Sequence, residues 1–326
     1  GGKFGGMVLY KVEYGTDCEL IWCDHRAHGT SLVSFMGTIP KENDFEKSTT
    51  DYLMTCGRDG NYSVYMFESS FSAPRMIHRA SLPLGQIEGF YFDPTTKHLM
   101  FIGFRGTMFV LWNESTQSEI MTFDCGNVHR WWVFQPYEDI PECGVILWNQ
   151  ARSLHAIDIR TSESRIIRVG SHGREIKDLA VFNPPQKNAA PLIASGAEDT
   201  ALRISTPSTC ETNPMWGSLR SLRVFTTHQT GLQKVSWSND GRYLFSSAGQ
   251  EEFFVWRVRL IPVFGLAAIV EARTEPVDKN ADPRVTNFDI REIEATSETD
   301  RFLIALVYSN SVVKVGVFVL YPFASR

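Results

Sequence analysis

Three residue types of a nucleophilic triad, a histidine, a serine and an aspartate, occur at His172, Ser195 and Asp199. His228 and Ser246 repeat the first two types further along the chain. A triad needs these side chains to meet around an accessible nucleophile, whereas a structural repeat places them at equivalent points of successive units. The order of the surrounding elements must therefore decide between the two.

Carboxylate pairs raise a second chemical possibility, because two acidic side chains flanking a sugar bond can hydrolyse it. Glu198-Asp199 and Glu251-Glu252 are such pairs. They fall at the same turn of neighbouring repeat units, so repeat position explains them without catalysis. The sequence contains no G-x-S-x-G, G-x-x-x-x-G-K-[ST] or H-E-x-x-H motif, and Gly1 to Gly6 lacks the flanks of a dinucleotide loop. We therefore predict a non-catalytic protein that needs no cofactor.

Potential zinc ligands cluster near the N-terminus at Cys18, Cys23, His25 and His28. The two cysteines are separated by an odd number of positions, and in a strand this points them to opposite faces. No metal site is predicted from them. The six cysteines of the chain are scattered without a C-x-x-C pair, which is typical of reduced core thiols, so we expect a cytoplasmic protein.

Short strand-like runs occupy almost the whole sequence, and helical periodicity is nearly absent. A polar turn recurs in these runs, with spacings of 46, 47, 47, 51 and 59 residues between its successive positions. Those positions are Asp59, Arg105, Arg152, Asp199, Gln250 and Ser309. An all-strand unit of this length predicts an all-β fold, a β-propeller of four-stranded blades.

Six blades follow from the repeat, and the N-terminal strands decide whether a seventh exists. The expected blades are Leu32–Phe67, Ile87–Trp112, Trp131–Ile159, Glu175–Ile204, Leu232–Val258 and Val285–Val319. Two strands, Met7–Val12 and Glu19–Cys23, precede them. Because an unpaired edge invites aggregation, we expect the ring to close by pairing of N- and C-terminal strands, with six or seven blades left open.

Composition agrees with one folded domain: the chain has 326 residues, 43% of them hydrophobic, and a net charge of −5. The longest apolar runs, Phe302–Tyr308 and Leu260–Val270, are too short for a membrane-spanning helix. The chain does not begin with methionine, so we expect it to be a piece of a longer protein.

Two units are more regular than the others and resemble WD repeats. The fourth contains His172-Gly173-Arg174-Glu175-Ile176-Lys177-Asp178 and Ala194 to Thr200, and the fifth runs from His228 through Ser246 to Trp256. In WD repeats, a His, a Ser, an Asp and a Trp form a hydrogen-bonded chain. The resemblance therefore implies structural roles for His172, Ser195, Asp199, His228, Ser246 and Trp256. Ser205 stands where the fourth unit needs Trp, and Gln250 where the fifth needs Asp, so each unit lacks one member.

A narrower resemblance covers about residues 170 to 290. The segments His172–Phe182, Ile193–Ile204 and Gly231–Arg259 are similar to the large multi-propeller WD-repeat protein that partners the tRNA wobble-position ribose 2′-O-methyltransferase. This resemblance implies that residues 1–326 form one propeller from the C-terminal part of a longer chain. It also implies a scaffold that binds the methyltransferase and helps to position tRNA, while the methyl donor site belongs to the enzyme.

Charge is distributed unevenly, which bears on RNA contact. Residues 150 to 260 carry 14 Lys and Arg against 10 Asp and Glu, while the remainder carries 18 against 27. The basic segment could follow phosphates. Candidate RNA or partner contacts are Arg152, Arg160, Arg165, Arg168, Arg174, Lys177, Arg220, Arg223 and the loop aromatic Trp216.

One alternative function stays open beside this interpretation. The basic residues could serve solubility alone, in which case the protein is a general protein-interaction propeller, a peptide reader or a ubiquitin-ligase receptor. The paired aromatics Trp131 and Trp132 are predicted to pack in the core at the start of a strand.

Overall fold

The computed structural model describes the chain in ten stretches: residues 2–12, 18–41, 50–67, 73–126, 131–160, 171–186, 189–208, 218–274, 283–296 and 299–321. All regular elements in these stretches are β-strands, and they pair antiparallel. In this part of the chain no helix is long and apolar enough to cross a membrane. The all-β class predicted from the sequence is confirmed.

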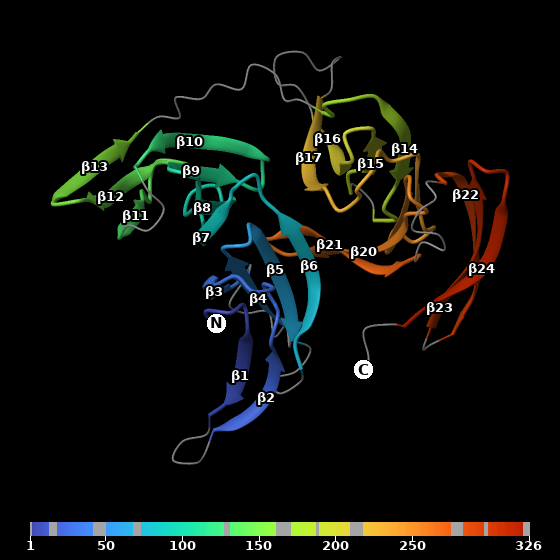
Figure 1. Ribbon diagram of the computed structural model, residues 1–326, viewed down its shortest axis with the longest axis horizontal. Coiled ribbons are helices and arrows are strands. Elements are labelled where there is room, and N and C mark those ends of the chain that lie inside the picture. Colours follow the sequence, from blue (N-terminus) through green and yellow to red (C-terminus); the bar gives the residue numbers. More distant parts are fainter. Residues whose placement is uncertain are drawn as a thin grey trace. The chain divides into compact units, whose positions relative to one another are not determined.

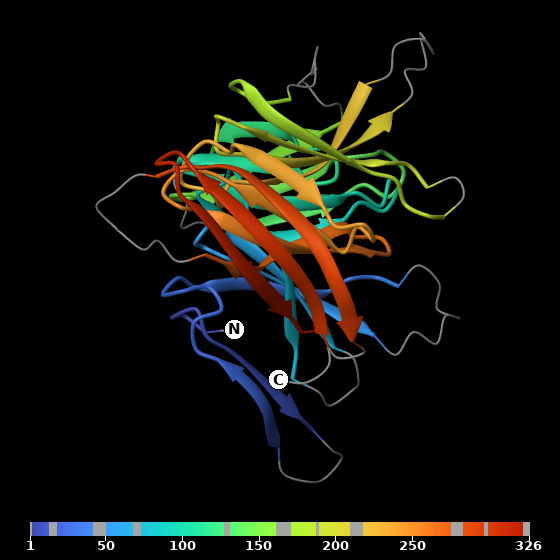
Figure 2. The same cartoon turned by 90° about the vertical axis from the view of Figure 1, so that its right-hand side faces the viewer.

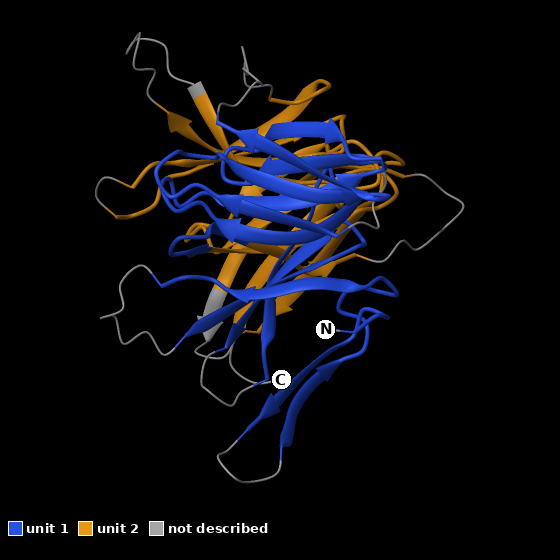
Figure 3. Ribbon diagram, turned by 90° about the vertical axis from the view of Figure 1, so that its left-hand side faces the viewer, with its two compact units in different colours: residues 1–169, 260–267 blue, residues 170–259, 268–326 orange. Residues whose placement is uncertain are grey.

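The chain divides into two compact units (Figure 3). Unit 1 comprises Gly1–Val169 and Leu260–Ala267, and unit 2 comprises Gly170–Arg259 and Ala268–Arg326. The expectation of a single propeller domain over residues 1–326 stays a prediction.

Unit 1 contains a hairpin followed by three sheets (Figure 1). The hairpin strands are β1 (Met7–Lys11) and β2 (Glu19–Asp24). The first sheet contains β3 (Val33–Thr38), β4 (Asp51–Gly57), β5 (Asn61–Phe67) and β6 (Arg75–Ser81). The second contains β7 (Gln86–Phe92), β8 (Leu99–Arg105), β9 (Met108–Asn113) and β10 (Ser118–Asp124). The third contains β11 (Trp132–Pro136), β12 (Gly144–Gln150) and β13 (Ser153–Ile159).

Unit 2 continues the pattern with three more sheets, the last of which is the group of three red strands in Figure 2. The fourth sheet contains β14 (Ile176–Phe182), β15 (Leu192–Ala197), β16 (Leu202–Ser208) and β17 (Ser218–Phe225). The fifth contains β18 (Lys234–Trp237), β19 (Tyr243–Ser247), β20 (Phe253–Ile261) and β21 (Gly265–Arg273), of which residues 260–267 fall in unit 1. The sixth contains β22 (Val285–Thr296), β23 (Thr299–Tyr308) and β24 (Val313–Leu320).

The recurring polar position marks the same point of every sheet, at or beside the turn between its second and third strands. Several of these turns contain a residue in the left-handed region, such as Gly60 at φ 73°, Gly106 at φ 64° and Thr200 at φ 65°. Tight strand connections need such residues, which explains why the turn signal recurs. The repeat therefore located all six sheets, while the outer strands β6, β10, β17 and β21 lay beyond the expected unit boundaries.

Neighbouring sheets of unit 2 are joined by equivalent backbone hydrogen bonds. The Leu232 N–H donates to the Ala197 carbonyl at 3.0 Å, and the Val285 N–H donates to the Ala248 carbonyl at 3.0 Å. The first strands β14, β18 and β22 contact one another in that order, as β3 and β7 do in unit 1. Sheets that stack through their first strands are typical of propeller blades.

Apolar faces of successive sheets form the core of each unit. In unit 2, Phe302 of the sixth sheet packs edge-on against Phe245 and Tyr243 of the fifth, with ring centroids 5.2 and 5.3 Å apart. In unit 1, Phe104 and Trp148 belong to one buried cluster formed by the second and third sheets. Burying an aromatic side chain contributes about 1.5–3 kcal/mol to the free energy of unfolding. The packing of one sheet on the next therefore accounts for a large part of the stability of each unit.

The N-terminal strands form a separate two-stranded sheet in which Met7 pairs with Asp24. Met7 is buried in a cluster with Val33 and Tyr65 of the first sheet. In the described residues, the third and sixth sheets have three strands each. Ring closure by the N-terminal strands and the number of blades therefore remain predictions.

Candidate functional site

A chain of hydrogen bonds crosses the fifth sheet between buried side chains. Trp256 Nε1–H on β20 donates to Ser246 Oγ on β19 at 2.8 Å. Ser246 Oγ lies 2.8 Å from His228 Nε2, and His228 Nδ1 lies 3.0 Å from the Glu252 carboxylate. Ser246 is fully buried, and Trp256 and His228 are 2% and 3% exposed. A carboxylate only accepts, so Nδ1 carries the proton and Nε2 accepts from the serine hydroxyl.

Glu252 supplies the acid in this sheet, and Gln250, which the spacing placed there, does not. Gln250 and Glu251 both have positive φ, 53° and 57°. The turn has the same length as in the fourth sheet, since Ser246 pairs with Phe254 as Ser195 pairs with Arg203, but the Glu252 N–H donates to the Gly249 carbonyl at 3.0 Å. The carboxylate that faces His228 therefore occurs two positions later than the repeat spacing predicted.

The fourth sheet contains the corresponding chain. His172 Nε2 lies 2.8 Å from Ser195 Oγ, and His172 Nδ1 lies 3.0 Å from the Asp199 carboxylate. Ser205 takes the place of the tryptophan, as the sequence indicated. Burial alone would raise the pKa of Asp199, but hydrogen bonds from the Gly173 N–H, His172 and the Ala201 N–H outweigh it and lower that pKa.

Unit 1 contains a third chain that sequence reasoning missed. His28 Nδ1 lies 3.0 Å from Asp59 Oδ1, and His28 Nε2 lies 3.0 Å from Thr55 Oγ1. Thr55 precedes Asp59 by four positions, the same spacing as from Ser195 to Asp199. This spacing was the available signal; it was missed because His28 was considered only as a zinc ligand and threonine replaces serine.

These chains leave no reactive nucleophile among the three. Histidine rings that face carboxylates on their other side hold the serine and threonine hydroxyls, as in a triad, but Thr55, Ser195 and Ser246 are themselves buried, so their hydroxyls are not accessible nucleophiles. Their geometry satisfies buried polar groups and thereby connects a sheet to the loop that enters it.

The carboxylate pairs do not form convergent acid sites. Glu198 forms an ion pair with Lys177 at 2.8 Å, and Glu251 lies 2.7 Å from Lys314. Asp199 and Glu252 belong to the histidine chains described above. Each carboxylate therefore has its own basic partner or histidine.

The N-terminal cysteines and histidines likewise do not gather into one set of ligands. Cys23 Sγ lies 3.7 Å from the His25 ring nitrogens, while His28 is engaged by Asp59. Within the described part of the chain no group of three or more His, Cys, Asp or Glu could hold a metal ion.

The candidate basic contacts have different surroundings. Arg152 and Arg220 are exposed, and Arg160 is exposed but paired with Asp158 at 2.8 Å. Arg223 is 3% exposed and donates to the Leu222 carbonyl at 2.7 Å. The sequence predicted a surface position for its guanidinium, and this prediction is wrong. The alternation of side chains along β17 points Arg223 inward, which the charge count could not reveal. Arg165, Arg168 and Trp216 lie outside the described residues.

Trp131 differs from its expected place in the core. Its side chain is 86% exposed, while Trp132 is half-buried and packs near Phe104. Because Trp131 precedes the first residue of β11, it is not constrained to the inner face of the sheet. An exposed indole of this kind can stack on a base or anchor a protein partner.

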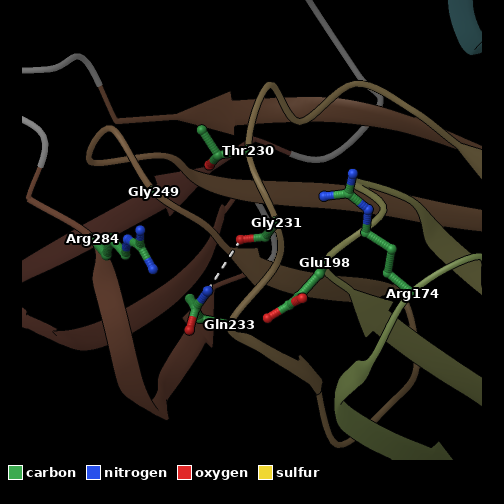
Figure 4. Close-up of a pocket in the computed structure, with 7 residues that line it drawn as sticks. All are labelled: Arg174, Glu198, Thr230, Gly231, Gln233, Gly249 and Arg284. Carbon is green, nitrogen blue, oxygen red and sulfur yellow. Dashed lines mark hydrogen bonds between the residues drawn. The ribbon is translucent and has the colours of Figure 1, made fainter.

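Arg174 lines a pocket in unit 2 (Figure 4). The pocket lies where the β15–β16 and β19–β20 turns adjoin the segments that lead into β14, β18 and β22. The pocket has a volume of about 230 Å³. Its lining residues are Arg174, Glu198, Thr230, Gly231, Gln233, Gly249 and Arg284. Arg174 and Arg284 lie on opposite sides, with Glu198 and Gln233 between them. Lys177 adjoins the pocket through Glu198.

Comparison with known proteins supports the resemblance seen in the sequence. The chain is 27% identical over 125 residues to the tRNA (34-2′-O)-methyltransferase regulator WDR6 of Pongo abelii, and 26% identical over 125 residues to that of Homo sapiens. Each match covers 38% of this chain and 11% of the relative. The resemblance to a WD-repeat protein of this kind is thereby confirmed, while the matched part spans a small fraction of those relatives.

Other comparisons add little. No family model matches the chain. Among solved structures, Saccharomyces cerevisiae Sqt1 aligns with 98% of this chain and 80% of its own, at 14% identity and a TM-score of 0.32.

Proposed function

We propose that this chain is a non-catalytic WD-repeat scaffold in a tRNA-modification complex, where it binds a ribose 2′-O-methyltransferase and helps to position tRNA. The observation that carries the proposal is the similarity over 125 residues to proteins named as regulators of a tRNA (34-2′-O)-methyltransferase. The buried histidine chains agree with a scaffold, because their hydroxyls serve structure rather than chemistry.

The architecture proposed for this scaffold is a closed propeller, part of a longer cytoplasmic protein. The support for ring closure comes from β24, which is the edge of a three-stranded sheet in the described part of the chain. Its alternate residues Val313, Val315, Val317 and Val319 are 60%, 65%, 48% and 39% exposed. An apolar strand with a free edge tends to pair with a further strand, and terminal pairing would provide one.

Co-purification tests the proposal. The natural protein that contains this chain is affinity-purified from its own cells, and bound protein and RNA are identified. We expect a ribose 2′-O-methyltransferase and tRNA to be retained. Retention of neither would refute the proposal, and retention of unrelated proteins without RNA would favour a general protein-interaction propeller.

A further inference from the structure

The pocket formed by the fourth, fifth and sixth sheets combines cationic donors with one acceptor. Arg174 and Arg284 are both exposed and face the pocket from opposite sides. Arg284 is fixed at its backbone, because its N–H donates to Ser309 Oγ at 3.0 Å and its carbonyl accepts from the Ser309 N–H at 2.9 Å. Two guanidinium groups across a small depression are suited to the oxygens of one anion.

A buried hydroxyl in the lining lacks a partner. Thr230 Oγ1 has almost no contact with solvent and no hydrogen-bond partner in the structure. A buried polar atom without a partner is costly, and a ligand oxygen is one way to satisfy it. A Cβ placed on Gly249 would lie 2.9 Å from this hydroxyl, so the glycine leaves the space in which Thr230 sits.

Glu198 provides the acceptor. Its Oε1 pairs with Lys177 Nζ at 2.8 Å, and the side chain remains 42% exposed. The hydrogen bond from Lys177 lowers the pKa of Glu198, and the charges of Arg174 and Arg284 lower it further, so the carboxylate is ionised at neutral pH.

Charge selects among anions. Arg174, Arg284 and Lys177 oppose Glu198 and Glu175, which also pairs with Lys177 at 2.8 Å, so the local charge is close to +1. A phosphodiester carries one negative charge and would neutralise the pocket, whereas a phosphomonoester carries about −1.5 to −2 and would leave an excess negative charge beside Glu198. A carboxylate beside an anion site can instead accept from a ribose 2′-hydroxyl, the group that distinguishes RNA from DNA.

We propose that this pocket binds a backbone phosphate of RNA, with Arg174 and Arg284 on the phosphate oxygens, the Thr230 side chain turned so that its hydroxyl reaches them, and Glu198 on the adjacent 2′-hydroxyl. The identification of the anion as RNA rests on the proposed function, while the anion site itself rests on the geometry. The methyltransferase need not contact the pocket for the phosphate to bind there.

The test measures binding of the full chain to an anticodon stem-loop RNA and to DNA of the same sequence, over a range of salt concentrations. The double variant R174Q/R284Q is compared with R291Q/R301Q, which removes two exposed arginines of β22 and β23 outside the pocket. We expect the pocket variant to lose about tenfold in RNA affinity per arginine, and the slope of log affinity against log salt to fall by about 1 for each. The control variant should keep the RNA affinity and the salt slope of the wild-type chain.

Two further measurements identify the chemical class of the ligand. E198Q should reduce the preference for RNA over DNA while leaving the salt slope unchanged, and inorganic phosphate should compete weakly with RNA. Equal RNA binding by the pocket and control variants overturns the proposal, as does tighter binding of a phosphopeptide than of RNA.

Methyltransferase retention is measured on the same proteins. If the wild-type chain binds RNA through the pocket but retains no methyltransferase, the proposed function fails and the pocket stands. If methyltransferase is retained and the pocket variant binds RNA normally, the pocket fails and the proposed function stands.

Discussion

Replacing Ser246 by alanine should destabilise the protein far more than the same change one residue later. The Ser246 hydroxyl accepts from Trp256 and donates to His228, each at 2.8 Å, and all three side chains are buried. Ser246→Ala therefore leaves a donor and an acceptor without partners, each at a cost of about 1–3 kcal/mol. We expect a loss of about 2–4 kcal/mol in the free energy of unfolding.

Ser247 is the matched control. It is also fully buried, but its hydroxyl has no hydrogen-bond partner in the structure. Ser247→Ala removes the same atom without leaving an unpaired neighbour, so we expect a change within about 0.5 kcal/mol or a slight stabilisation. Urea unfolding followed by tryptophan fluorescence gives both values, provided the slope of free energy against urea is unchanged.

A double-mutant cycle with Trp256→Phe isolates the hydrogen bond. In the Ser246→Ala background, removing the indole N–H removes the orphaned donor, so the second change should cost at least 1 kcal/mol less than it does alone. The reasoning would be refuted by equal effects of Ser246→Ala and Ser247→Ala, or by additive effects in the cycle.

Three further predictions concern residues that hold the fold together. Burial lowers the pKa of His228 below its usual value near 6.5 despite Glu252, so as the pH falls the unfolded chain takes up this proton before the folded chain does. The free energy of unfolding should therefore fall as the pH drops through and below 6.5. His228→Gln should flatten this dependence in urea midpoints measured from about pH 7.5 to about 5.5. Asp59→Asn should cost about 1–3 kcal/mol in thermal unfolding, because Asp59 accepts from His28 and from Arg79; an unchanged melting temperature would contradict a third histidine chain. Gly231→Ala should cost about 1–3 kcal/mol, since its Cβ would lie 2.9 Å from the Glu198 backbone, whereas Gly316→Ala meets open space and should be tolerated; equal stability of the two variants would argue against that close approach.

Much of the fold could be predicted because turns impose a strong local signal. The polar position recurred where each sheet turns from its second to its third strand, and the left-handed residues there need particular residue types. Outer strands such as β6 and β17 were missed because arginines and other polar residues interrupt their apolar residues, so their alternation is weak.

The site was harder to predict because its partners are distant in sequence. His28 meets Asp59 across 31 positions, and Glu252 faces His228 in place of Gln250, with two left-handed residues, Gln250 and Glu251, before it in the turn. Of the two arginines in the pocket, the sequence singled out Arg174 alone, since Arg284 lies outside the basic segment and joins the same pocket only when the sheets stack.

We propose that this chain acts through an enzyme that it binds. Ribose 2′-O-methylation of tRNA at the wobble nucleotide is measured for the methyltransferase with and without the natural protein that contains this chain. We expect the protein alone to transfer no methyl group and the enzyme to become active on tRNA when the protein is added. Methyl transfer by the protein alone, or full activity of the enzyme without it, would refute the proposed function.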